Sequence, residues 1–125
     1  MPPWMQWIGL PHRFGANPED GEAADCIVMV FSVLRWAGVH HPPFEQRWLD
    51  LAAQGRYPEL VEIWQSKTRL LPNPKTYSIT MLNHGDKGLG FGVVVDDGVL
   101  TVNHKRGVYW IPVEVTKNLS FYEFV

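Results

Sequence analysis

The pattern of hydrophobic and polar residues changes along the chain. Residues 7–24 are rich in glycine, proline and polar turn formers, which predicts an irregular loop. The next run, 26–37, is apolar on nearly every face, follows Asp25 as a helix N-cap and ends at Gly38. Its β-branched residues would also permit a strand, but its length and its two end signals favour a buried helix.

Two more helices and a series of strands are predicted downstream. Residues 44–53 place apolar side chains on one helical stripe, and Pro58 begins a third helix. Short runs rich in β-branched and aromatic residues follow, and they predict strands at 77–82, 91–95, 99–103, 107–112 and 119–124. Asp96-Asp97-Gly98 is a strong hairpin signal between two of them. We therefore expect an α+β domain in which the central helix packs on a C-terminal antiparallel sheet.

Composition narrows the class of protein. The 125 residues suit one domain, 1–125, and a hydrophobic content of 46% excludes overall disorder. A net charge of -2 lacks the basic excess of a nucleic-acid-binding surface. The N-terminus does not resemble a secretory signal, and no apolar run approaches the roughly 18–20 residues of a membrane span. We expect neither nucleic acid nor a membrane as a partner.

The chain contains one cysteine, Cys26, so it forms no intrachain disulfide and suits a reducing compartment. Cys26 begins the predicted central helix, where free N–H groups and the helix dipole stabilise a thiolate. A free cysteine is also among the residues most often buried, so a structural thiol is the alternative. Position and composition leave both roles open.

Short motifs surround Cys26: residues 7–15 read Trp-Ile-Gly-Leu-Pro-His-Arg-Phe-Gly, residues 24–26 read Ala-Asp-Cys, and Gly38-Val39 is followed by Pro42. They resemble the opening, nucleophile and exit motifs of the NlpC-type cysteine peptidases, papain-like cell-wall hydrolases, especially the versions carried by tailed phages. Residues 90–102 are similar to that family's strand pair. The resemblance covers nearly the whole chain and implies a papain-like NlpC-type fold with Cys26 as nucleophile.

The chain departs from this family at the catalytic histidine. In the family the histidine that pairs with the cysteine begins the first strand of the pair, where this chain has Gly90, and the orienting third residue falls on Val102. His84, just before Gly90, and His104 are the candidates for a relocated base. His104 would share the face of Val102 if the strand extends that far. Each histidine also has a simpler interpretation as an exposed turn residue.

The remaining candidate site residues are His12 and Asp25. His12 lies where the N-terminal loop would border the cleft, and we expect it and Asp25 to contact substrate if there is one. Solvent exposure for His12 and a helix cap for Asp25 are the simpler roles. His40 and His41, with Cys26, lack a zinc-binding spacing, so we expect neither a metal nor a cofactor.

Two functions remain, and they share a fold. One is an active cysteine peptidase that cleaves the peptide stems of peptidoglycan, with Cys26 attacking a carbonyl and backbone N–H groups holding the oxyanion. The other is a phage tail-tip or tail-assembly protein that keeps the fold without catalysis and binds other tail proteins. The missing histidine at Gly90 favours the second. It would place the protein in the virion tail, or in the host cytoplasm during assembly.

Aromatic residues near the N-terminus add a hypothesis about binding. Trp4, Trp7 and Trp110, together with Pro2 and Pro3, provide more apolar surface than a small monomer usually leaves at its terminus and sheet edge. We expect at least some of them to contact a partner chain.

Overall fold

The structure, a computed structural model, describes residues 2–83, 89–116 and 118–125. These ranges contain the helices α1 (Cys26–Ala37), α2 (Gln46–Ala53) and α3 (Tyr57–Lys67). The strands are β1 (Thr68–Leu71), β2 (Ile79–Asn83), β3 (Leu89–Val95), β4 (Gly98–Asn103), β5 (Gly107–Pro112) and β6 (Phe121–Phe124). They form one antiparallel sheet in the order β1-β6-β2-β3-β4-β5, so the protein is α+β, as the hydrophobic pattern predicts.

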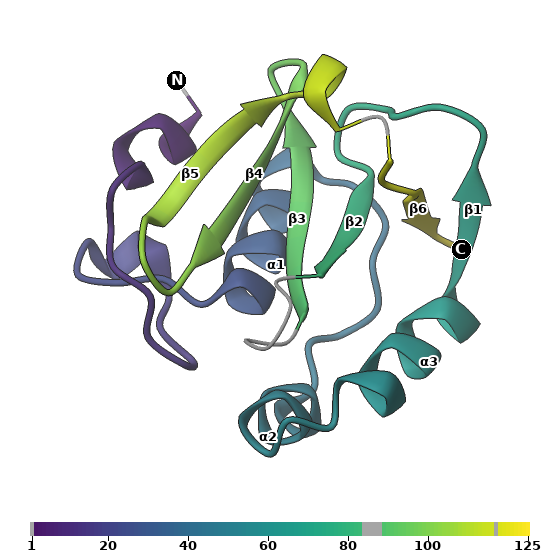
Figure 1. The fold of residues 1–125 in the computed structure, drawn as a ribbon, viewed down its shortest axis with the longest axis horizontal. Coiled ribbons are helices and arrows are strands. Elements are labelled where there is room, and N and C mark those ends of the chain that lie inside the picture. Colours follow the sequence, from purple (N-terminus) through teal and green to yellow (C-terminus); the bar gives the residue numbers. More distant parts are fainter. Residues whose placement is uncertain (1, 84–88, 117) are drawn as a thin grey trace.

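Helix α1 is the centre of the core, as expected. It lies behind the sheet in Figure 1 and packs on β3 and β4. The Asp25 side chain caps its first turn, and Gly38 ends it with a left-handed φ of 70°. Its residues from Met29 to Leu34 are buried because the sheet covers one side of the helix and other elements cover the rest.

Helices α2 and α3 close one end of the core. Trp48 of α2 and Trp64 of α3 pack on Phe31 of α1, with ring centroids 5.3 Å and 5.7 Å away. Phe124 of β6 contacts the same ring at 5.8 Å, so the end of the chain is tied to its central helix. No helix in the described ranges is long and apolar enough to cross a membrane.

The predicted strands are confirmed, and so is the hairpin. Asp96 and Asp97 take φ values of 50° and 62°, and Val95 pairs with Gly98 across the turn. Strand β1 was not predicted. Its four residues show no alternation of apolar and polar side chains, and the strand exists because it pairs with distant β6, with Thr68 opposite Phe124.

Trp4 and Trp7 are not among the aromatic residues that remain available for a partner chain. They are only 2% and 4% exposed. Both belong to the 3-10 helix η1 (Pro3–Trp7), in which side chains three positions apart lie on one face, and that face is turned inward. Trp4 Nε1 donates a hydrogen bond to Asp96 Oδ2 at 3.1 Å. Trp110, in contrast, is 37% exposed.

The N-terminal loop, residues 8–17, crosses the outer edge of β5. Gly9 N–H donates to the Val108 carbonyl at 2.9 Å, and Val108 N–H donates to the Leu10 carbonyl at 2.8 Å. Gly107 allows this approach, because its φ is +71° and a Cβ there would overlap the Leu10 carbonyl. The path of the loop therefore depends on the absence of a side chain at Gly107.

We expect Gly107→Ala to lower the free energy of unfolding more than Gly55→Ala, a matched control. Gly55 has the same φ of +71°, but a Cβ added there would meet no atom within 4 Å. The control carries only the left-handed backbone cost of about 1–2 kcal/mol. Gly107→Ala adds the displacement of the loop, roughly 1–3 kcal/mol more. Urea unfolding measures both, and equal losses would contradict the close contact with Leu10.

Candidate functional site

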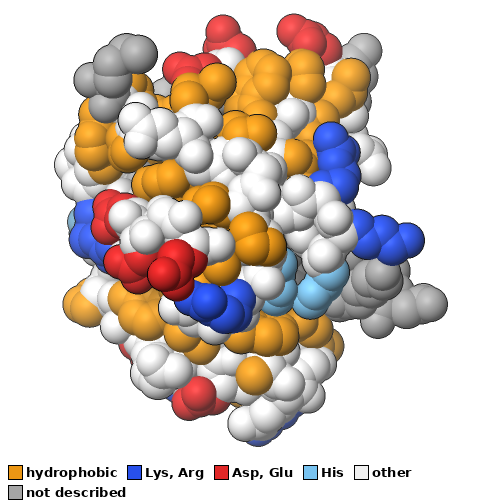
Figure 2. All heavy atoms as spheres, turned by 90° about the vertical axis from the view of Figure 1, so that its left-hand side faces the viewer, with side chains coloured by type: hydrophobic (Ala, Val, Ile, Leu, Met, Phe, Trp, Pro, Cys, Tyr) orange, Lys and Arg blue, Asp and Glu red, His pale blue; other side chains and the backbone are white. Residues whose placement is uncertain are grey.

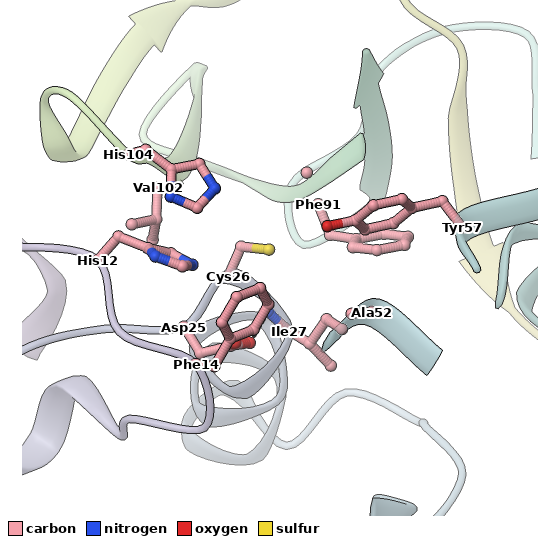
Figure 3. A pocket seen from close by; sticks show the side chains of 11 residues that line it. His12, Phe14, Asp25, Cys26, Ile27, Ala52, Tyr57, Phe91, Val102 and His104 are labelled. Carbon is pink, nitrogen blue, oxygen red and sulfur yellow. Dashed lines mark hydrogen bonds between the residues drawn. The ribbon is translucent and has the colours of Figure 1, made fainter. Parts of the chain in front are cut away.

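Cys26 lies in a small pocket where the first turn of α1 meets the N-terminal loop, the start of β3, the end of β4 and the start of α3 (Figure 3). The pocket is lined by His12, Phe14, Asp25, Cys26, Ile27, Ala52, Tyr57, Gly90, Phe91, Val102 and His104. Its volume is about 30 Å³, which holds a water molecule or two. A peptide could reach the sulfur only after lining side chains move.

The pocket includes the two strand positions singled out in the sequence. Gly90, in β3, and Val102, in β4, both line it. Neither can accept a proton from Cys26, since glycine has no side chain and valine carries only methyl groups. The sheet positions at which the resemblance expects catalytic side chains, Gly90 and Val102, therefore offer no group that can accept a proton.

Two histidines lie at the pocket instead. The rings of His12 and His104 are 4.2 Å apart between centroids, and Phe14 packs edge-on against His12 at 5.0 Å. Figure 3 shows both imidazoles on the same side of Cys26. His12 is half-buried and His104 is exposed. The third candidate, His84, lies outside the described residues.

The thiol of Cys26 is held in its protonated form. Burial, and to a smaller extent the neighbouring Asp25 carboxylate, raise its pKa to about 12, and the backbone N–H groups of Phe91 and Ile27 act in the opposite direction. Neither imidazole is among the groups that shift this pKa. In Figure 3 the sulfur points toward the side where Tyr57 and Phe91 lie.

His12 is the more perturbed of the two imidazoles. Burial lowers its pKa, the nearby His104 lowers it further, and Asp25 acts in the opposite direction. At neutral pH His12 is therefore uncharged, with a ring nitrogen able to accept a proton. An uncharged imidazole can act as a general base, although its lowered pKa makes His12 a weaker one, and His12 is not among the groups that shift the pKa of Cys26.

Asp25 is buried and its oxygens bind backbone groups. Oδ1 accepts from Ile27 N–H at 2.8 Å and Val28 N–H at 3.3 Å, which is the cap that the sequence predicts. Oδ2 accepts from Gly15 N–H at 3.1 Å, in the N-terminal loop. One carboxylate thus joins the loop that carries His12 to the helix that carries Cys26.

Tyr57 is a polar pocket residue that sequence reasoning missed. It begins α3, and in Figure 3 its hydroxyl points into the pocket toward Cys26. Burial raises its pKa, and the negative charge of the Asp25 carboxylate adds to this. No local motif marks Tyr57, because it reaches the pocket only through the packing of α3 beside α2 and α1.

Within residues 2–83, 89–116 and 118–125, no three His, Cys, Asp or Glu side chains are grouped as ligands for a metal ion. No family model matches the chain, and no match was found among the curated proteins or the solved structures. Cys26, the two imidazoles and the Tyr57 hydroxyl are the groups that could take part in chemistry.

We expect Cys26 to react slowly with iodoacetamide at neutral pH in the folded protein and quickly in urea, because only the thiolate is nucleophilic. It is the one cysteine of the chain, so all labelling reports on it. The ordinary pKa is 9.0 and the folded value about 12. Above pH 9 the unfolded thiol loses its proton while the folded one keeps it, so the free energy of unfolding falls with pH. Cys26→Ala removes the part of this fall that the thiol causes, and fast labelling of the folded protein would contradict the prediction.

We expect Asp25→Ala to lower the free energy of unfolding by about 2–4 kcal/mol, because three backbone N–H groups lose their acceptor. Asn17→Ala is the control, since Asn17 caps the short helix η2 (Pro18–Asp20) and makes only a long hydrogen bond to α1, in which it accepts from Ser32 Oγ at 3.4 Å. Its loss should stay within about 1 kcal/mol. Urea unfolding compares the two variants, and similar losses would show that Asp25 does not hold the loop.

Proposed function

We propose that the protein is a phage tail-tip or tail-assembly protein with the papain-like fold of the NlpC-type peptidases and with little or no catalysis at Cys26. One observation carries the proposal. Gly90 and Val102, the positions at which the resemblance expects the base and its orienting residue, both line the Cys26 pocket. The two positions that the resemblance assigns to the base and its orienting residue therefore lie at the pocket, but glycine and valine occupy them.

The state of the thiol supports the loss of catalysis. With a pKa raised to about 12, almost none of the thiol is ionised at pH 7. An efficient cysteine peptidase needs a base close to the sulfur, both to form the thiolate and to protonate the leaving amine. The small pocket adds a second obstacle, because its volume of about 30 Å³ does not accommodate a peptide substrate beside the sulfur.

The order of the elements supports the papain-like assignment. Cys26 begins the buried helix α1, which packs on β3 and β4, and these strands are joined by the tight turn at Asp96-Asp97. A nucleophile at the start of a central helix facing an antiparallel sheet is the arrangement that the resemblance implies. Fold alone does not determine function, so the binding role rests on the replaced side chains.

The alternative is an active peptidase acting on peptidoglycan stem peptides, and the pair of His12 and His104 favours it. In this reaction the Cys26 thiol gives its proton to an imidazole as sulfur attacks the carbonyl carbon. Backbone N–H groups beside the sulfur and the Tyr57 hydroxyl then stabilise the oxyanion, and the imidazolium protonates the leaving amine. Both Cys26 and the N-terminal loop would have to move first.

We expect the purified protein to release little or no product from peptidoglycan or muropeptides, measured by chromatography of the digest. Cys26→Ala should leave the fold intact and should leave incorporation into virions largely unchanged, because the thiol is not required for assembly. Phage particles carrying the variant provide that measurement.

Robust muropeptide cleavage that Cys26→Ala abolishes would overturn the structural role in favour of the peptidase. His104→Ala, His12→Ala and His84→Ala would then identify the relocated base, since only the base should reduce kcat strongly while leaving KM nearly unchanged.

A further inference from the structure

The outer edge of β5 is covered along only half of its length. β5 is the last strand of the sheet, so one of its edges has no neighbouring strand. The backbone groups of Val108 on that edge bind Gly9 and Leu10 of the N-terminal loop. Trp110 lies two residues further on, so its N–H and carbonyl point the same way. The described residues supply no backbone partner for either group.

A groove lies beside this open half. It has a volume of about 450 Å³ and is lined by Met5, Ile8, Asp96, Arg106, Tyr109 and Trp110. Met5 and Ile8 are 64% and 43% exposed, which is unusual for apolar side chains that lie together. Figure 2 faces the side of the molecule where η1 and β5 lie and shows hydrophobic side chains spread over it.

The indole wall of the groove is held in place. Trp110 Nε1 donates to the Val95 carbonyl at 2.9 Å, and the ring lies against Gly98, where a Cβ would overlap it. A ligand that packs on the Trp110 ring loses little binding free energy to ordering it, because both contacts already hold the ring without the ligand. The site is therefore preformed.

The groove carries opposite charges at its two ends. Arg106 precedes β5 and stacks on the Tyr109 ring, with its Cζ 4.4 Å from the ring centroid. Asp96 lies toward the other end, since the next strand begins at Gly98, which pairs with Pro112. A strand running antiparallel to β5 would bring its amino end toward Asp96 and its carboxyl end toward Arg106.

We propose that this groove binds an extended apolar segment of another protein, which adds a short antiparallel strand beside Trp110. The segment exchanges two hydrogen bonds with the Trp110 backbone and places apolar side chains against Met5, Ile8 and the indole. A basic residue at its amino end and an acidic residue at its carboxyl end complement Asp96 and Arg106. This deepens the proposed assembly role, on which it rests, by naming the surface and the chemistry of the partner.

A second copy of this chain does not fit the same edge. Symmetric pairing of two β5 strands about Trp110 would set Pro112 of one copy opposite Val108 of the other. The outward groups of Val108 already bind Gly9 and Leu10. The loop therefore leaves room for a short segment and blocks a second full-length β5.

Random linear peptides displayed on yeast and selected on the purified full chain test the proposal. We expect enriched peptides to have an apolar stretch with a basic residue before it and an acidic residue after it. A synthetic copy of the strongest peptide should shift the Trp110 amide and indole resonances and slow hydrogen exchange at the Trp110 amide. Reversing its two charges should weaken binding.

Met5→Asp and Leu70→Asp form a matched pair for this test. Both side chains are 64% exposed, and Leu70 lies in β1, the opposite edge strand of the sheet. Met5→Asp should weaken binding of the peptide by about tenfold or more, and Leu70→Asp should leave its affinity unchanged. If Met5→Asp unfolds the protein, the exchange of the Trp110 amide in the unaltered chain still decides the result.

The proposal is overturned if no peptide is enriched, if binding survives Met5→Asp in the folded variant, or if Trp110 is unaffected by the peptide. It is also overturned if the chain forms a dimer that Met5→Asp dissociates, since the occupant would then be a second copy. None of these results restores muropeptide cleavage or removes the protein from virions, so the failure of this proposal is distinguishable from failure of the assembly role.

Discussion

The Asp25 carboxylate is the contact on which the arrangement of the pocket depends. Its two oxygens accept N–H groups from the first turn of α1 and from Gly15. A buried carboxylate that lost these donors would be costly, so the loop and the helix are kept together. The same charge helps to keep the Cys26 thiol protonated. One interaction thus brings the thiol beside His12 and also opposes its ionisation, which suits a structural centre better than a reactive one.

The N-terminal loop links the two surfaces to which we assign a role. It crosses β5 at Val108, where Gly107 allows the approach, and then carries His12 over Cys26. By covering the first half of the β5 edge it leaves Trp110 as the exposed part. The path of the N-terminal loop therefore explains both why the Cys26 pocket is small and why the β5 edge beside Trp110 is open.

Local signals in the sequence were sufficient for much of the fold. Asp25 and Gly38 mark the two ends of α1. Both signals can be found in the sequence, because capping by a carboxylate and termination by a left-handed glycine each depend on one residue. The hairpin at 96–98 follows in the same way from residues that tolerate positive φ. Strand β1 and the inward orientation of Trp4 could not be found like this, since each depends on a partner more than fifty positions away in the chain. No pattern within a short window carries that information.

The sequence by itself determined that Cys26 begins a buried helix, that an antiparallel sheet follows, and that Gly90 and Val102 cannot serve as a base. These conclusions depend on side-chain chemistry and on local periodicity, which are present in the chain before it folds. Only the tertiary structure decided that His12 and His104 lie together at the pocket, that Tyr57 faces Cys26, and that half of β5 is open. Those features arise from packing between distant segments, where the distance and direction between two groups are set by all the elements that separate them.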